Sequence, residues 1–286
     1  MMKQEIEFIK FNPTQNMTIL VRTKHPPEEH RHIAAALMAY DHVHAEQVGF
    51  IERPQRREAD AFLRMAGGEF CGNACMALAA YLADERGLEP DNTAHFVLEV
   101  SGTDRNVACQ VSRTNEAYVC RVAVPAPIAI ERKIVQYEGD ELRLAVIRYE
   151  HCIHIVIEVE QFSETMRNKA QGLAHLLGRI MGTDLIGILL FKPSTSELAP
   201  LIYVPSLDSM VWERGCGSGT ASVGAYLAWS SQDSISAAIR QPGGTIRVTA
   251  EYDGGEAVTK LSIEGTAGIV ALGKAFVDET RALTTI

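Results

Sequence analysis

Two cysteines stand in matching contexts in the two halves of the chain. Residues 71–82 read CGNACMALAAYL and residues 216–227 read CGSGTASVGAYL, so both segments begin with Cys-Gly and share Ala-Tyr-Leu at the same distance from the cysteine. Cys71 and Cys216 are separated by about half of the 286 residues. The repeat therefore indicates two related halves, each of which contributes one thiol.

The residues around each cysteine predict a position at the start of a helix. A Gly-rich turn leads from the cysteine into a run of small apolar residues, which is typical of a helix buried on all sides. The N-terminus of such a helix has unpaired N–H groups and a partial positive charge, so it binds anions. It also lowers the pKa of a cysteine from its usual value of about 8.5.

Two such helix ends facing one cleft could move the α-proton of an amino acid. The N–H groups would hold the carboxylate and stabilise the developing carbanion, while a thiolate removes the proton and a thiol returns one on the opposite face. Cys71 and Cys216 are the predicted acid–base pair. The alternative is that both are small buried apolar residues, the usual role of a free cysteine; the repeated Gly-flanked context favours catalysis.

The remaining pattern predicts an α/β (α+β) protein with strands wrapped around a central helix in each half. Alternating segments predict strands before residue 24, at 44–52, between 96 and 124 and after 141, and helices at 28–40 and 162–181. A break at Pro125-Ala126-Pro127 divides an N-terminal domain of residues 1–124, which carries Cys71, from a C-terminal domain of residues 125–265, which carries Cys216. Residues 266–286 are expected to return to the first domain.

Composition excludes several classes of protein. The formal net charge is −9, which argues against a nucleic-acid binder because such proteins normally carry clustered Lys and Arg. No apolar stretch approaches the length of a membrane span, and the N-terminus lacks the apolar core of a signal peptide. We therefore expect a cytoplasmic protein without a membrane partner, in which the six cysteines are thiols.

The motifs GGEFCGNA and ERGCGSGTAS resemble the two active-site motifs of the diaminopimelate epimerase fold family of cofactor-independent amino-acid racemases and epimerases. EQVGFIE and QPGG are similar to its histidine racemase branch, which serves staphylopine-type metallophore biosynthesis. The resemblance extends from residue 8 to residue 276. It implies two pseudo-symmetric domains, each a barrel-like, mostly antiparallel sheet around a helix, and conversion of L-histidine to D-histidine in the cleft between them. Homodimers are common in this fold.

The resemblance also implies substrate-binding residues. Asn16 matches a substrate-contacting Asn, Glu46 is a candidate partner for the imidazole, and Glu213 is a candidate for orienting the loop before Cys216. The N–H groups expected to hold the α-carboxylate belong to Gly72, Asn73, Gly217 and Ser218.

Alternatives remain for several of these residues. Glu46 could lie on the solvent face of a strand, Asn16 could serve only a turn, and Glu213 could be a solvated loop residue. Zinc binding by Cys75 or by His151 and His154 is conceivable, but paired Cys-x-x-Cys and HExxH motifs are missing, so no metal is expected. The two histidines are expected on one face of a strand.

Alternative functions remain open too. They are a diaminopimelate epimerase, a racemase of another amino acid, and a non-catalytic amino-acid-binding protein. Diaminopimelate epimerases have a longer loop where Glu213-Arg214-Gly215 directly precedes Cys216. The short loop favours a smaller substrate such as histidine, and retention of both cysteines favours an active enzyme.

Overall fold

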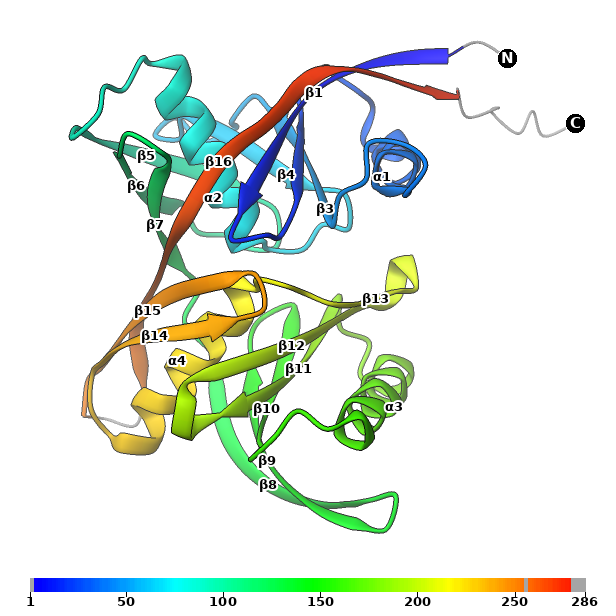
Figure 1. Cartoon of the computed structure of the whole chain (residues 1–286), viewed down its shortest axis with the longest axis vertical. Coiled ribbons are helices and arrows are strands. Elements are labelled where there is room, and N and C mark those ends of the chain that lie inside the picture. The colour runs from blue at the N-terminus through cyan, green and yellow to red at the C-terminus, as the bar shows by residue number, and fades with distance from the viewer. Residues whose placement is uncertain (1–2, 255–256, 279–286) are drawn as a thin grey trace, which may run out of the picture.

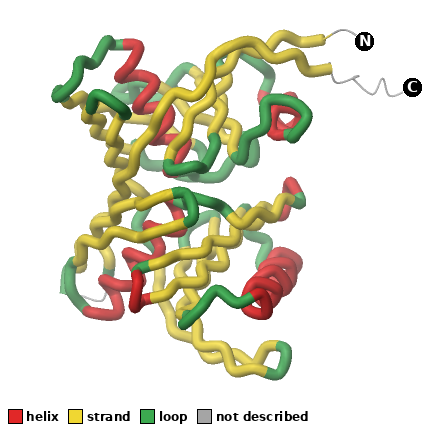
Figure 2. The backbone as a smooth tube through the Cα atoms, in the orientation of Figure 1, coloured by secondary structure: helices red, strands yellow, loops and turns green. Residues whose placement is uncertain are grey.

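The chain builds two lobes, each with strands around one helix, as Figures 1 and 2 show. The computed structural model describes residues 3–254 and 257–278. The first lobe contains β1 (Lys3–Pro13), β2 (Thr18–Val21), α1 (His30–Met38), β3 (Gln47–Glu52), β4 (Ala61–Met65), α2 (Gly72–Glu85), β5 (Thr93–Val100), β6 (Val107–Arg113) and β7 (Tyr118–Val124). The second contains β8 (Ala129–Tyr137), β9 (Asp140–Arg148), β10 (Cys152–Glu158), α3 (Glu164–Ile180), β11 (Leu185–Lys192), β12 (Glu197–Val204), β13 (Ser209–Trp212), α4 (Gly217–Ser231), β14 (Ile235–Gln241) and β15 (Gly244–Tyr252). The last strand is β16 (Val258–Asp278).

The internal repeat extends to the topology of the two lobes. In the first, β2 pairs in parallel with β3 across α1, and β4 pairs in parallel with β5 across α2. In the second, β10 pairs in parallel with β11 across α3, and β12 pairs in parallel with β14 across α4. The helices that follow Cys71 and Cys216 therefore occupy equivalent positions, as the matching motifs predict.

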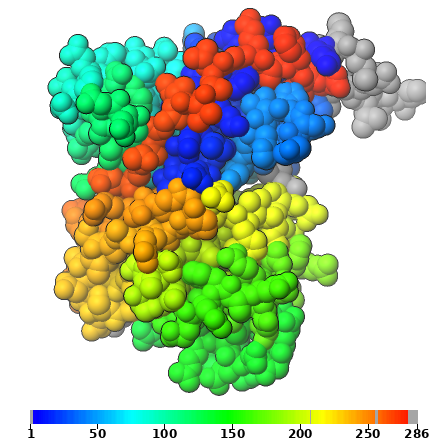
Figure 3. Space-filling view, in the orientation of Figure 1, coloured from blue at the N-terminus to red at the C-terminus, as the bar shows by residue number. Residues whose placement is uncertain are grey.

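Strand β16 belongs to both lobes. It pairs with β15 and β7 near its start, and then with β1 from Ala267 to Asp278. The ring from β1 through β7 to β16 is closed around α2, whereas the second lobe ends at β8 and stays open among the described residues. Figure 3 shows β1, in blue, and the end of β16, in red, side by side on the first lobe. The domain boundaries given above stay a prediction, and residues 279–286 lie outside the described residues.

The two central helices are buried because their side chains are small and apolar all round. Eleven of the fourteen residues of α2 are buried, as are ten of the fifteen residues of α4. Gly224 lets α4 approach β15 closely, since a Cβ there would overlap Val248. A helix enclosed in this way fixes the position of the residue at its N-terminus.

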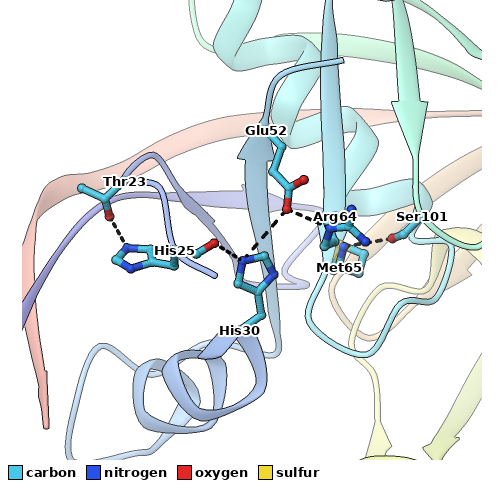
Figure 4. Close-up of polar contacts among 7 residues, drawn as sticks. All are labelled: Thr23, His25, His30, Glu52, Arg64, Met65 and Ser101. Atoms are coloured by element: carbon cyan, nitrogen blue, oxygen red, sulfur yellow. Dashed lines mark hydrogen bonds and ion pairs between the residues drawn. The ribbon is translucent and has the colours of Figure 1, made fainter. Parts of the chain in front are cut away.

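The outer helices cover the sheets on one side of the molecule (Figure 1). The ring of His30 in α1 stacks on Phe50 of β3 at 3.7 Å, and its Nε2 lies 3.1 Å from the carbonyl oxygen of His25. Glu52 of β3 pairs with Arg64 of β4 at 2.8 Å, as Figure 4 shows. The ring of His30 on Phe50, and its Nε2 at 4.0 Å from Oε1 of Glu52, fasten α1 to the sheet. Among the described residues, no helix combines the length and apolar character that crossing a bilayer requires.

Candidate active site

Cys71 and Cys216 occupy the same position on their helices. Each is the N-cap residue with an extended backbone, at φ −130° for Cys71 and φ −112° for Cys216. The Sγ of Cys71 accepts a hydrogen bond from the N–H of Ala74 at 3.4 Å, and the Sγ of Cys216 accepts one from Gly219 at 3.2 Å. Both sulfurs thus stand where a helix presents its unpaired donors.

The two helix N-termini meet at β16. A Cβ on Gly72 would lie 2.6 Å from Cδ1 of Ile263, and one on Gly217 would lie 2.8 Å from the same atom. The side-chain amide of Asn73 donates to the carbonyl oxygen of Gly215 at 2.7 Å, which ties the start of α2 to the loop before Cys216. The glycines let the helix ends approach one another, and the cross-lobe hydrogen bond holds them there.

Both cysteines line one small cavity of about 30 Å³ between the lobes. The cavity contains the predicted carboxylate-binding residues of both helix starts together with two acidic residues and a glutamine. Its lining includes Cys71, Asn73, Glu69, Gln47, Glu213 and Cys216.

The expectation of a lowered cysteine pKa is wrong for the protein without substrate. Burial raises the pKa of the Cys71 thiol, and the charges of Glu213 and Glu69 raise it further. Burial also raises the pKa of Cys216 well above the usual range, with Glu213 next in effect. The helix N–H groups oppose these shifts but do not outweigh them. Both thiols therefore hold their protons until a bound group offsets the effect of burial or neutralises the nearby carboxylates.

Glu213 is buried beside Cys216 rather than solvated. Its carboxyl accepts a hydrogen bond from the side-chain amide of Gln47 at 2.9 Å, and its charge raises the pKa of the Cys216 thiol. Burial raises the pKa of Glu213 to about 7, and the charge of Glu46 adds to the shift. A carboxyl with this pKa exchanges protons readily near neutral pH.

Asn16 and Glu46 lie together at the edge of this site. The amide of Asn16 donates to Oε2 of Glu46 at 3.0 Å and also bonds the carboxyl of Glu213. Asn16 is fully buried, and burial raises the pKa of Glu46. Glu46 lines a neighbouring cavity of about 40 Å³ that Glu69 and Glu213 share, but it does not line the cavity of the thiols.

The structure adds residues that the sequence did not point to. Gln241 accepts a hydrogen bond from the N–H of Cys216 at 2.7 Å and donates one to the hydroxyl of Thr220 at 2.8 Å. It therefore holds the backbone of Cys216 from outside α4. Gln47 and Glu69 line the thiol cavity. Glu69 is two residues before Cys71, which is the only signal in the sequence that could have singled it out.

A larger cavity of about 370 Å³ adjoins the thiol cavity and shares Glu69, Phe70, Leu185 and Ser218 with it. His151 and His154 both line it, but they do not share a strand face as expected. His151 lies in the turn before β10, while His154 is buried within β10 and contacts the hydroxyl of Ser222 at 2.6 Å. Residues three apart on a strand point to opposite faces, so the expectation was wrong.

Replacing Glu213 by glutamine should change how stability depends on pH. The pKa of Glu213 is about 7 in the folded protein and 4.5 in an ordinary glutamate, so the folded chain binds this proton more tightly. The free energy of unfolding therefore falls as the pH rises through this window. The free energy of unfolding of Glu213→Gln, measured relative to that of wild type, should therefore rise by about 3 kcal/mol between pH 4.5 and pH 8. Denaturant unfolding of both proteins at pH 4.5 and pH 8 measures this change. If variant and wild type differ in free energy of unfolding by the same amount at both pH values, the buried, protonatable carboxyl is contradicted.

The family model and the relatives that match this chain point to one family. A family model described as the histidine racemase CntK N-terminal domain matches residues 5–276. The chain is 35% identical over 280 residues to a histidine racemase of Staphylococcus aureus, covering 97% of this chain and 100% of that protein. The chain belongs to the histidine racemase family. A histidine racemase of Fusobacterium nucleatum is 27% identical over 284 residues, with 96% of this chain and 98% of that protein covered.

A solved structure extends the likeness of fold beyond this family. The hydroxyproline epimerase from Agrobacterium vitis superimposes with a TM-score of 0.74 at 11% sequence identity, covering 96% of this chain and 93% of that one. At this identity the likeness concerns the fold alone. The resemblance proposed from the Cys-Gly motifs is confirmed for the family, and the expected α+β fold is confirmed by the architecture and by this structure.

Proposed function

We propose that the protein converts L-histidine to D-histidine by two-base catalysis with its own thiols. One of Cys71 and Cys216 removes the α-proton as a thiolate, and the other delivers a proton to the opposite face. The observation that carries the proposal is the convergence of two cysteine N-caps on one cavity between two helix N-termini. Family membership supports the reaction and the substrate.

The helix N-termini suit the substrate α-carboxylate. The N–H groups at the start of α2 and α4 supply the donors, from Gly72, Asn73, Gly217 and Ser218. As the α-proton leaves, negative charge spreads onto the carboxylate, and donors already aimed at it stabilise that charge. The N–H groups of Ala74 and Gly219, which point at the two sulfurs, stabilise the thiolate that takes the proton. The helix ends thus stabilise both the negative charge on the substrate and the thiolate that takes its proton.

The charges around the site suit a substrate with more than one cationic nitrogen. Glu46, Glu69 and Glu213 line the adjoining cavities. The nearby Arg214 is exposed, and its guanidinium donates to the side chain of Gln15 at 2.7 Å. A second substrate carboxylate, as in diaminopimelate, would meet these acidic side chains with Arg214 already engaged. Histidine, with an α-ammonium and a basic ring, complements them.

Glu213 supports proton exchange at Cys216. Its carboxyl lies close enough to the thiol for each group to shift the pKa of the other, and its own pKa of about 7 lets it take a proton from that thiol or return one. Gln47 and Asn16 hold the carboxyl in place from the first lobe. We propose that Glu213 resets the protonation state of Cys216 between turnovers.

The proposed function is tested by incubating the purified protein with each common L-amino acid and with diaminopimelate, without added cofactor, and separating enantiomers by chiral chromatography. We expect D-histidine as the main product. Faster turnover of another amino acid would overturn the assignment of histidine, and no turnover of any substrate would favour a non-catalytic binding protein.

Supply of D-histidine to metallophore biosynthesis, a cytoplasmic location and a homodimer stay predictions.

Replacing Glu46 by glutamine should weaken turnover of histidine. The carboxylate is proposed to accept a charge-assisted hydrogen bond from the imidazole, and the glutamine side chain would offer only a neutral acceptor. A loss of about 1.5–3 kcal/mol corresponds to roughly one to two powers of ten in kcat/KM. Steady-state kinetics of Glu46→Gln measure it, with the exposed Glu58→Gln as a matched control. A wild-type rate in Glu46→Gln would show that the imidazole is recognised elsewhere.

A further inference from the structure

Glu69 stands where the three cavities of the lobe interface meet. It lines the thiol cavity, the cavity beside Glu46 and the larger cavity of about 370 Å³. Its loop is held from the turn after β5, because the hydroxyl of Ser101 accepts from the N–H of Met65 at 2.9 Å and donates to the carbonyl oxygen of Glu69 at 3.0 Å. Figure 4 shows Ser101 beside Met65. The carboxyl therefore extends from a fixed backbone.

The carboxyl of Glu69 lacks a donor for one of its oxygens. Its Oε2 is buried and has no hydrogen-bond partner. Because both oxygens of a carboxylate are acceptors, rotation of the group cannot remove this deficit. Backbone N–H groups of Gly67 and Glu69 lower the pKa of this carboxyl, but burial outweighs them and raises it, and the charge of Asp184 adds to the rise. Across residues 3–254 and 257–278, no Lys, Arg or His forms an ion pair with Glu69. A buried carboxylate in this position calls for a cationic donor from outside the chain.

The geometry of the reaction identifies that donor. The α-carbon must lie between the two sulfurs and the α-carboxylate at the helix ends, so the α-nitrogen, one bond from the α-carbon, also lies in the thiol cavity. Two carboxyls line that cavity, Glu69 and Glu213, and Glu213 already accepts a hydrogen bond from Gln47. Glu46 lines only the adjoining cavity. The imidazole ring of histidine begins two bonds beyond the α-carbon and would reach that cavity.

We propose that Glu69 binds the α-ammonium group of the amino-acid substrate. The inference rests on the proposed function and adds the recognition of the group that all α-amino acids share. The ammonium supplies the N–H donor that Oε2 lacks. Its positive charge also offsets the charge of Glu69.

Substrate binding and thiol ionisation are linked through this contact. The charge of Glu69 helps to keep the pKa of Cys71 high in the absence of substrate. An ammonium group bound between them removes that effect and adds a favourable interaction with the thiolate. The bound ammonium therefore favours the thiolate of Cys71, which forms by release of the thiol proton to solvent as the substrate binds; without substrate the thiol stays protonated and less reactive.

Equilibrium binding of two ligands that differ only in the amino group tests the assignment. L-Histidine and 3-(imidazol-4-yl)propionate, which lacks the α-amino group, are titrated calorimetrically into the full chain. A Cys71→Ser background prevents turnover during the titration. Glu69→Gln keeps the shape of the side chain and removes its charge. Asp184→Asn is the matched control, because it removes a nearby negative charge outside the thiol cavity.

We expect Glu69→Gln to weaken binding of L-histidine about 10- to 100-fold and to change binding of the deaminated analogue less than about threefold. Asp184→Asn should affect both ligands little. Equal weakening of the two ligands by Glu69→Gln, or no change for L-histidine, would overturn the assignment. Racemisation of histidine by the wild-type protein is measured in parallel. An active wild type with unchanged binding in Glu69→Gln refutes the role of Glu69 alone, whereas an inactive wild type refutes the proposed function and this inference with it.

Discussion

Replacing either Cys71 or Cys216 by serine should reduce racemisation of histidine by about a thousandfold or more. A serine hydroxyl is far less acidic than a thiol, so it keeps the shape of the residue and loses the base or the acid on one face of the substrate. Positioned acid–base groups contribute about 10²–10⁴-fold each. Both variants should fail in both directions, because each direction of the reaction uses both residues.

Cys120→Ser is the matched control for these variants. Cys120 is fully buried in β7, and its thiol donates to the carbonyl oxygen of Met76 at 3.5 Å, a contact that a hydroxyl can keep. Initial rates from L-histidine and from D-histidine, with circular dichroism to check folding, compare the three variants. Near-wild-type rates in a folded Cys71→Ser or Cys216→Ser would show that the replaced cysteine only packs.

Replacing Gly215 by alanine should cost about a hundredfold in kcat/KM. A Cβ at this position would overlap the carbonyl oxygen of Thr14, a main-chain atom that cannot rotate away. The loop before Cys216 would then move away from the first lobe, and the hydrogen bond from Asn73 to Gly215 would be strained. A displacement of about 1 Å between catalytic groups is enough for a loss of about 10²-fold.

The matched control is Gly268→Ala, since a Cβ there would meet no atom within 4 Å. Kinetics and thermal unfolding of both variants distinguish a displaced site from general destabilisation. We expect Gly268→Ala to resemble wild type in both measurements. A Gly215→Ala variant with wild-type kinetics would show that the contact between the Thr14 turn and the second lobe does not set the distance between the thiols.

Much of the architecture could be predicted from the repeated Cys-Gly segments. The run of small and apolar residues after the first motif has no polar face, so it had to lie at the centre of a lobe, and the second copy required a second lobe of the same kind. The parallel pairings across α2 and α4 follow from this repeat. The sharing of β16 between the lobes was not evident, because a strand's partners depend on register over long sequence separations.

The acidic surroundings of the thiols were harder to predict. Gln47 reaches Glu213 from another lobe, 166 residues away in sequence, and Gln241 reaches Cys216 from β14. Such partners are determined by the packing of the lobes rather than by local pattern. The sign of the cysteine pKa shift depends on the same packing. The helix N-terminus was visible in the sequence, whereas the burial and the carboxylate of Glu69 that oppose it were not.

Racemisation of L-histidine in D₂O tests the two-thiol account most directly. One thiol keeps the proton that it removes, and the other delivers a deuteron taken from solvent to the opposite face. At low conversion, D-histidine should therefore carry deuterium at Cα, while the remaining L-histidine should keep its original proton. Chiral separation followed by mass spectrometry measures both pools. D-histidine that retains the original proton, or deuterium entering L-histidine as fast as D-histidine forms, would contradict two opposed bases and indicate a single one.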